Sequence, residues 1–345
     1  MKNFWSQLKK PIYVLAPMAG VADSAFRQIC KSFGADVVYS EMISATAVVY
    51  DSKKTFELME FSKKERPFVV QLFGSKPEHF AKAAKIVEKK IKPDGIDINF
   101  GCPVKKVARQ GAGAVLMNDF KLAREIVAAV INNTSLPVSI KIRSCVGSSK
   151  ALDFLKYLAD LDIKAVMIHG RSAAQGNSGE IDWKMIKQAR LFVKGVLLAN
   201  GGIKTAADAD GLLKKTGADG VGIGQGALGK PWIFEQLKIK RQSDIQDGQI
   251  NKIPLTPFVK GGKQREDIFK IMLRHAKLAE KLKGNQACPQ RSRLRGGRGI
   301  IEMRKHLCWY VSGLPDASFL RRGLIKVESV KEIKKILNAP LIKGD

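Results

Sequence analysis

The stretch GVLLANGGI, residues 195–203, passes from a short apolar run directly into Asn200, Gly201 and Gly202. Seven other short apolar runs recur along the chain, and amphipathic segments of helical period lie between them. The eight runs are 12–16, 36–40, 68–73, 95–99, 138–142, 165–169, 195–199 and 220–223. Apolar strands that alternate with helices are typical of a parallel sheet covered by helices. Eight such units predict a (β/α)8 TIM barrel, whose usual length is about 250 residues, with an open doubly wound sheet as the alternative.

The pattern changes beyond the eighth run. Residues 241–264 are polar and contain prolines and glycines, which predicts a linker or long loop. Apolar positions at helical spacing then predict helices over residues 265–283, about 300–310 and about 327–337. We therefore predict a (β/α)8 barrel domain over 1–240, the linker over 241–264 and a small C-terminal helical domain over 265–345.

The formal net charge of +28 is the strongest global signal in the composition. Residues 281–305 contain eight Lys or Arg and one acidic residue, Glu302. Cations at this density neutralise phosphates and release counterions, so the segment predicts contact with a nucleic acid. The residues predicted to contact RNA here are Arg291, Arg293, Arg295, Arg298, Arg304 and Lys305.

Cysteine usage and hydropathy exclude several classes of protein. The five cysteines lie far apart without a C-x-x-C pair, which argues against a disulfide framework and against a structural zinc site, so no metal is expected. No apolar run approaches the length of about 18 residues that a membrane span needs. The apolar run at 12–16 is also too short for a signal-peptide core. We expect a cytoplasmic protein that does not bind membranes.

The ends of the eight runs are polar or rich in glycine, and in a TIM barrel this end forms the active site. The ends Asn200–Gly202 and Gly224–Gly226 predict a phosphate site, because glycine exposes backbone N–H groups ahead of a helix N-terminus. Lys141, His169 and Gln71 end three other runs. A lysine there can place positive charge beside an electron-rich ring, and one glutamine amide can meet a ring carbonyl and a ring N–H.

Cys102 is the cysteine whose surroundings indicate chemistry. Gly101 and Pro103 flank it just beyond the fourth run, so its thiol lies on a short loop of defined shape. A thiol can act as a nucleophile or as a general acid. No histidine adjoins Cys102 in the sequence, which gives the nucleophile no support.

Seven motifs together resemble the tRNA-dihydrouridine synthases, specifically their bacterial B-type branch. They are APMAG (16–20), QLFG (71–74), NFGCP (99–103), KIR (141–143), HGR (169–171), NGGI (200–203) and GQGALG (224–229). The sequence EMRKH at 302–306, with Trp309 and Tyr310, is similar to that family's helical-domain signature. The resemblance implies an enzyme that reduces uridine in tRNA to 5,6-dihydrouridine, with FMN as cofactor, NADPH as reductant and a helical tRNA-binding domain. It implies that a hydride passes from flavin N5 to C6 while Cys102 protonates C5.

The resemblance also implies roles for individual residues, with tRNA as the partner and a monomer as the expected state. The implied cofactor-binding residues are Pro17, Met18, Ala19, Gln71, Lys141, His169, Asn200, Gly201, Gly202, Gly224 and Gln225. Asn99, Arg143 and Arg171 are implied to face the substrate.

The chain departs from the family pattern at several positions. Gln225 stands where the family usually has arginine, and Ala173 lies where a second arginine is expected. The third residue of Asn200-Gly201-Gly202 is often acidic in the family, and residues 241–263 and 285–299 are longer and more basic than is typical. Two alternatives stay open: an FMN-dependent oxidoreductase of a free pyrimidine, and a non-catalytic RNA-binding barrel.

Overall fold

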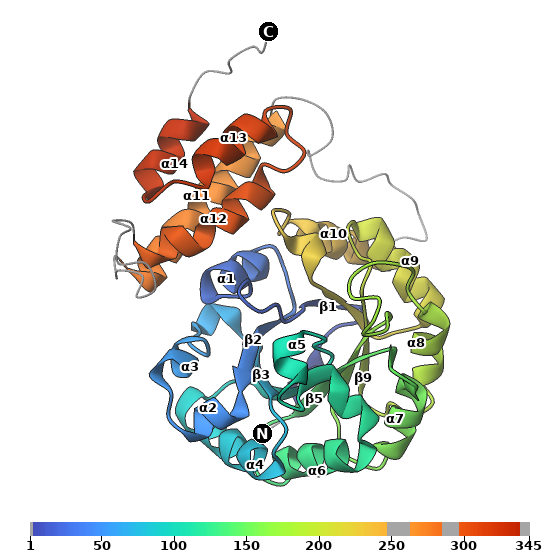
Figure 1. Ribbon diagram of the computed structural model, residues 1–345. Coiled ribbons are helices and arrows are strands. Elements are labelled where there is room, and N and C mark those ends of the chain that lie inside the picture. Colours follow the sequence, from blue (N-terminus) through green and yellow to red (C-terminus); the bar gives the residue numbers. More distant parts are fainter. Residues whose placement is uncertain (1–2, 247–262, 285–296, 339–345) are drawn as a thin grey trace. The chain divides into compact units, whose positions relative to one another are not determined.

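Eight parallel strands close into a barrel in the computed structural model, which describes residues 3–246, 263–284 and 297–338. Neighbours around the ring follow the order β1-β10-β9-β8-β5-β4-β3-β2, and β1 pairs with both β10 and β2 (Figure 1). The strands are β1 (Ile12–Leu15), β2 (Val37–Ser44), β3 (Phe68–Phe73), β4 (Gly95–Phe100), β5 (Val138–Arg143), β8 (Ala165–His169), β9 (Val196–Asn200) and β10 (Gly220–Ile223). The predicted TIM barrel is confirmed, and the open sheet is wrong.

The inside of the barrel is apolar at the end where the strands begin. Successive strand residues point to opposite faces, so every second residue points inward. The inward residues Ile12, Val37, Val69, Ala165 and Val196 belong to one buried cluster. Trp5, in the short turn η1 (Phe4–Gln7) before β1, is 1% exposed and belongs to the same cluster. The N-terminal segment therefore packs against this end, and the polar inward residues Asn99, Lys141 and His169 lie nearer the other one.

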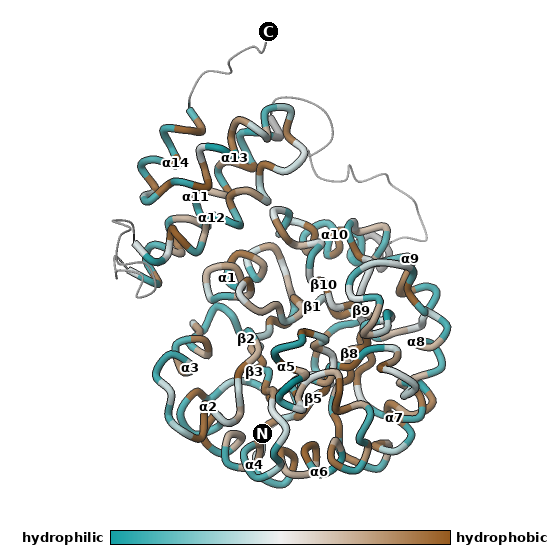
Figure 2. The backbone as a smooth tube through the Cα atoms, in the orientation of Figure 1, coloured by the Kyte–Doolittle hydropathy of each residue, from teal (hydrophilic) through white to brown (hydrophobic). Residues whose placement is uncertain are grey.

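Helices follow the strands as the sequence predicts. They are α1 (Ser24–Ser32), α2 (Ala45–Val49), α3 (Lys53–Glu57), α4 (Pro77–Ile86), α5 (Lys105–Ala108), α6 (Phe120–Ile131), α7 (Ala151–Tyr157), α8 (Trp183–Ala189), α9 (Ala206–Thr216) and α10 (Ile233–Gln246). Figure 2 shows hydrophobic residues concentrated along β5, β8 and β9, inside this ring of helices. A hairpin that the sequence did not predict, β6 (Cys145–Val146) with β7 (Ser149–Lys150), lies between β5 and α7.

Contacts divide the chain into two compact units, Met1–Asp23 with Cys30–Gly226, and Ser24–Ile29 with Ala227–Asp345. The second unit contains α10 and four further helices: α11 (Lys263–Lys283), α12 (Arg298–Tyr310), α13 (Ala317–Leu324) and α14 (Val330–Leu337). Its core includes Phe26, whose ring centroid lies 4.8 Å from that of His306.

This division differs from the predicted boundaries at 240 and 264. Residues 24–29 belong with the second unit because Phe26 packs against its helices. The predicted linker at 241–264 is wrong at its two ends, because α10 continues to Gln246 and α11 already begins at Lys263. Residues 247–262 of that linker lie outside the described residues.

Candidate active site

A chain of buried polar side chains crosses the inside of the barrel at β3 and β4. Asp97 and Gln71 are paired in the strand register, and both side chains are 0% exposed. The Gln71 amide donates from Nε2 to Asp97 Oδ2 at 2.7 Å and accepts at Oε1 from Asn99 Nδ2 at 2.8 Å. Ser139 Oγ on β5 donates to the other oxygen of Asp97 at 2.6 Å. Both polar atoms of the predicted ring-contacting Gln71 thus have partners within the protein.

The loop that carries Cys102 is attached to the same chain. Asn99 Oδ1 accepts hydrogen bonds from the backbone N–H groups of Cys102, at 2.9 Å, and Gly101, at 3.1 Å. The Cys102 carbonyl accepts from Ala114 N at 3.0 Å. Gly113 has a φ of +72°, and a Cβ there would lie 2.7 Å from the Cys102 carbonyl oxygen, so only glycine allows this close approach. Cys102 is therefore held on both sides, while its side chain stays partly exposed.

Lys141 and His169 lie on the same inward face, near the carboxyl ends of β5 and β8. Burial and then repulsion by Arg143 lower the pKa of Lys141 to about 8, against the attraction of Asp97 and Cys102. Burial and then the nearby positive charges, Lys141 first, lower the pKa of His169 to about 3. The site therefore presents a neutral imidazole beside an ammonium group that is cationic at neutral pH.

Arg143 and Arg171, predicted to face the substrate, connect loops at the barrel mouth. Arg143 donates from Nε to Gly101 O at 2.9 Å and from Nη1 to Ser172 O at 3.0 Å and Gly176 O at 2.5 Å. It thereby joins the Cys102 loop to the loop after β8. Arg171 donates from Nε to Gly179 O at 2.8 Å within that second loop. Its Nη2 would lie 3.7 Å from a Cβ built on Gly202.

The residues predicted to bind a phosphate lie at the ends of β9 and β10. Gly201 and Gly202 have φ values of +111° and +69°, and a Cβ on Gly201 would lie 2.6 Å from the His169 ring. Asn200 Nδ2 donates to Gly222 O at 2.7 Å, which ties the two strand ends together. Next to them, after the neighbouring strand β1, lies Met18: a Cβ on Gly224 would lie 3.5 Å from its Sδ, so the predicted Pro17–Ala19 segment borders these strand ends.

Of the helix termini predicted to complete the phosphate site, one carries an acidic cap and the other is a short turn. The N-terminus of α9 is occupied by Asp208, whose Oδ2 accepts from the backbone N–H groups of Lys204 at 2.9 Å and Thr205 at 2.8 Å. Gln225 begins only a three-residue 3-10 turn, η5 (Gln225–Ala227). An anion at this end would therefore meet glycine backbone rather than a helix dipole.

The segment after Cys102 presents cations at the mouth. Lys105, Lys106 and Arg109 are exposed, and Val104 is 55% exposed beside them. Within the described part of the chain, no ion pair or hydrogen bond engages the side-chain nitrogens of these three residues. Figure 2 shows α5 as hydrophilic. The sequence does not single out this group, because three cations do not stand out in a chain with a net charge of +28.

The C-terminal residues predicted to contact RNA differ in their partners and in their exposure. Arg304 donates from Nε to Val327 O at 2.8 Å and from Nη2 to Lys326 O at 3.0 Å, and Arg298 Nε donates to Glu302 Oε1 at 2.9 Å. Lys305 is exposed. Arg291, Arg293 and Arg295 lie outside the described residues. Two of the six thus stabilise their own unit.

Asp97 is the main site residue that sequence reasoning missed. A detectable signal was present, because an ionisable residue interrupts the apolar run Gly95–Asn99 two positions before Asn99. The period of two in a strand places both side chains on one face. Burial raises the pKa of Asp97 to about 6, against the hydrogen bonds from Ser139 and Gln71 and the charge of Lys141.

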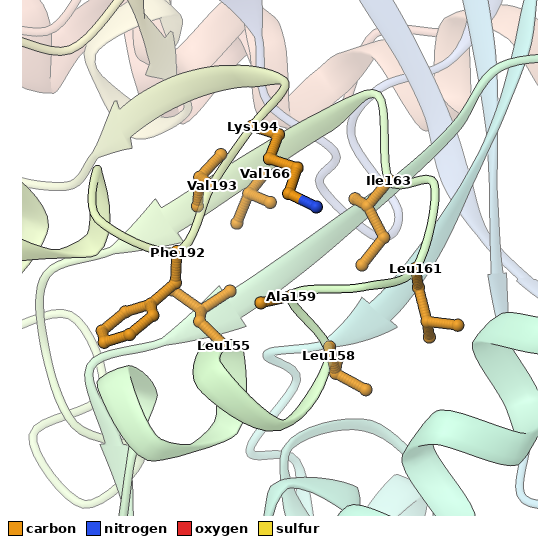
Figure 3. A pocket seen from close by; sticks show the side chains of 9 residues that line it. All are labelled: Leu155, Leu158, Ala159, Leu161, Ile163, Val166, Phe192, Val193 and Lys194. Carbon is orange, nitrogen blue, oxygen red and sulfur yellow. The ribbon is translucent and has the colours of Figure 1, made fainter.

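A small cavity elsewhere offers no competing site. It lies between α7, β8 and the segment before β9, and it is lined by apolar side chains and Lys194 (Figure 3). Val166 in its wall has the outward parity of β8, so the cavity lies between sheet and helices. Its volume of about 20 Å³ has room for about one water molecule. Among the described residues there is no metal-binding group of three or more His, Cys, Asp or Glu, and no helix long and apolar enough to cross a membrane.

Comparisons with known proteins agree with the geometry. Residues 14–343 match the model of a family described as dihydrouridine synthase. A protein of Aquifex aeolicus named "Probable tRNA-dihydrouridine synthase" is 32% identical over 330 residues, covering 95% of this chain and 95% of that protein. One of the same name from Rickettsia bellii is 35% identical over 311 residues, covering 89% of this chain and 88% of the relative. Among solved structures, 6-hydroxypseudooxynicotine amine oxidase of Pseudomonas geniculata N1 superposes with a TM-score of 0.52 at 12% identity, over 68% of this chain and 48% of that one, which supports the fold alone.

Proposed function

The chain belongs to the dihydrouridine synthase family, and on that premise we propose that it reduces uridine in tRNA to 5,6-dihydrouridine, using FMN and NADPH, as a cytoplasmic monomer. The observation that supports this most is the placement of Cys102. Its loop is fixed to Asn99 at the barrel mouth, beside Lys141 and Arg143. The finer assignment to the B-type branch stays a prediction.

The residues at the mouth fit FMN. The backbone of Asn200–Gly202 and Gly224–Gln225 would hold the phosphate, because glycines without side chains, two of them at positive φ, leave backbone N–H groups open to an anion. Lys141 would place its positive charge beside the ring system, with neutral His169 near it and the Met18 segment bordering the site. Since Gln225 contributes no charge, we expect weak retention of the cofactor. Bound FMN would supply to C6 of the uracil ring the hydride that it receives from NADPH.

Cys102 would complete the reduction as general acid. Addition of a hydride at C6 builds negative charge that is relieved by a proton on C5, and the Cys102 thiol would donate that proton. The thiolate left behind would attract Lys141 and Arg143 and so partly offset the lowering of their pKa values by burial, which means that the same two cations would stabilise it. Solvent then returns the proton to sulfur.

The mouth also suits a macromolecular substrate. Lys105, Lys106 and Arg109 lie three to seven residues beyond the thiol, and no acidic residue among the described ones pairs with them. We propose that they contact phosphates next to the target uridine, together with the basic C-terminal unit. A free pyrimidine has no phosphate chain for such contacts, which favours tRNA over the free-base alternative.

Nucleoside mass spectrometry of tRNA from a strain lacking this chain tests the proposal. We expect one or more dihydrouridine positions to be lost and to return when the intact chain is supplied, but not when Cys102→Ala is supplied. Unchanged dihydrouridine at every position would contradict the proposal, and restoration by Cys102→Ala would remove the thiol from the mechanism.

A further inference from the structure

We propose that Asp97 is a positioning residue whose carboxylate fixes, through the amides of Gln71 and Asn99, the loop that presents the Cys102 thiol. The proposal rests on the function proposed above for Cys102. It concerns a residue that touches neither the thiol nor, in this account, the substrate.

The direction of each amide follows from Asp97. An ionised carboxylate can only accept hydrogen bonds, so Gln71 must turn its Nε2 toward Asp97, at 2.7 Å. That choice turns Oε1 toward Asn99, which must then donate from Nδ2, at 2.8 Å. Asn99 in turn is left with Oδ1 facing the backbone N–H groups of Gly101 and Cys102. The acceptor at Asp97 and the backbone donors of Gly101 and Cys102 thus fix the same orientation of both amides from opposite ends of the chain.

The alternative explanation of a buried carboxylate is charge balance for Lys141. Among the described residues no ion pair of 4.0 Å or less joins Asp97 to Lys141, whereas both oxygens of Asp97 accept hydrogen bonds from Gln71 and Ser139. Burial is complete, at 0% exposure, so loss of an acceptor here leaves the Gln71 N–H without a water to replace it. The contacts therefore assign Asp97 to the amide chain.

Two substitutions at position 97 separate acceptor from charge. Asp97→Asn keeps an acceptor for Gln71, and its new N–H₂ can donate to Ser139 Oγ, so the amide directions survive. Asp97→Leu keeps the branched shape but removes the acceptor. Ser139→Ala is the matched control, because it removes the hydrogen bond to the other carboxylate oxygen and leaves the Gln71 contact in place.

The first readout is hydrogen exchange of the peptide containing Gly101 and Cys102, measured on the full chain without tRNA. We expect Asp97→Leu to speed exchange there by about tenfold, as the loss of one hydrogen bond implies. Asp97→Asn and Ser139→Ala should stay within about twofold of the unsubstituted chain. The rate at which iodoacetamide alkylates Cys102, followed by peptide mass spectrometry, should change in Asp97→Leu and not in the other two.

The second readout is turnover. Asp97→Leu should lower kcat and leave KM for tRNA nearly unchanged, whereas Asp97→Asn should retain most of the kcat of the unsubstituted chain. If Asp97→Leu does not fold, Gln71→Met interrupts the same chain at its next member and should raise exchange at Gly101 and Cys102 equally. Native exchange and alkylation rates in the folded variants would overturn the proposal. Because neither rate depends on catalysis, that failure is distinct from a failure of the proposed function.

Discussion

The barrel and the C-terminal unit use their polar residues in different ways. In the barrel, residues from β3, β4, β5, β8 and β9 meet at one end, and they are joined by buried hydrogen bonds such as Gln71 to Asp97. In the C-terminal unit, arginines predicted to contact RNA are engaged inside the unit, Arg304 with backbone carbonyls and Arg298 with Glu302. The position of a residue at a strand end of a barrel therefore predicts that its side chain lies in the site. The presence of an arginine on a helix does not predict whether it contacts RNA or a group of its own unit.

The largest effect is expected from substitution of the Cys102 thiol, which changes the reaction and leaves the surrounding barrel in place. Cys102→Ala should lower dihydrouridine formation by about 10² to 10⁴-fold, the usual contribution of a positioned acid. Cys102→Ser should be nearly as inactive, because a hydroxyl is a far weaker acid than a thiol, whose ordinary pKa is about 8.5. Cys145→Ala, at the partly exposed thiol of the β6–β7 hairpin, is the control and should retain turnover. Near-normal product from Cys102→Ala in a mass-spectrometric assay would assign Cys102 to packing alone.

The buried carboxylate of the barrel should appear in the pH dependence of stability. The pKa of Asp97 is raised from 3.8 to about 6, so the folded state binds a proton more tightly than the unfolded state. The free energy of unfolding should therefore fall as pH rises from about 3 to about 7, by about 3 kcal/mol. Denaturant titrations of the unsubstituted chain and Asp97→Asn should show this fall only in the former. Parallel pH profiles would contradict the pKa shift.

The mouth of the barrel should contribute to RNA binding independently of the C-terminal unit. Substituting Lys105, Lys106 and Arg109 by alanine should flatten the dependence of log K on log salt by about 2 to 3, at about 0.7 to 0.9 per phosphate contact. Alanine at Lys82, Lys85 and Lys89, which are exposed on α4 and the turn after it, removes the same charge elsewhere and should have a smaller effect. Equal effects of the two triple variants would mean that only net charge matters.

The smallest effect concerns Arg304. Arg304→Met removes two hydrogen bonds to backbone carbonyls and should lower the free energy of unfolding by about 1 to 3 kcal/mol. Its effect on the salt dependence of tRNA binding should be slight. A flattened salt slope with unchanged stability would return Arg304 to the RNA-contacting group that the sequence predicts.

The sequence predicted the barrel because period and strand spacing are local properties. Strand ends such as Phe68–Phe73 and Ala165–His169 agree with the predicted runs. The sequence could not predict the hydrogen bond between the side chains of Gln71 and Asn99, because that bond depends on the register between β3 and β4. Asp97 was missed for the same reason, since its importance lies in its partners. The capping of α9 by Asp208 could not be predicted either, because it depends on where Asp208 lies in the first turn of the helix.

One measurement tests the central claim most directly: oxygen-free stopped-flow oxidation of the reduced, FMN-loaded protein by different acceptors. The account predicts rapid reoxidation by tRNA that lacks dihydrouridine, with one dihydrouridine formed per flavin oxidised, and little reoxidation by free uridine or uracil. Reoxidation by the free pyrimidines as fast as by tRNA would contradict it in favour of a free-base oxidoreductase. No reoxidation by any of them would contradict it in favour of a non-catalytic RNA-binding barrel.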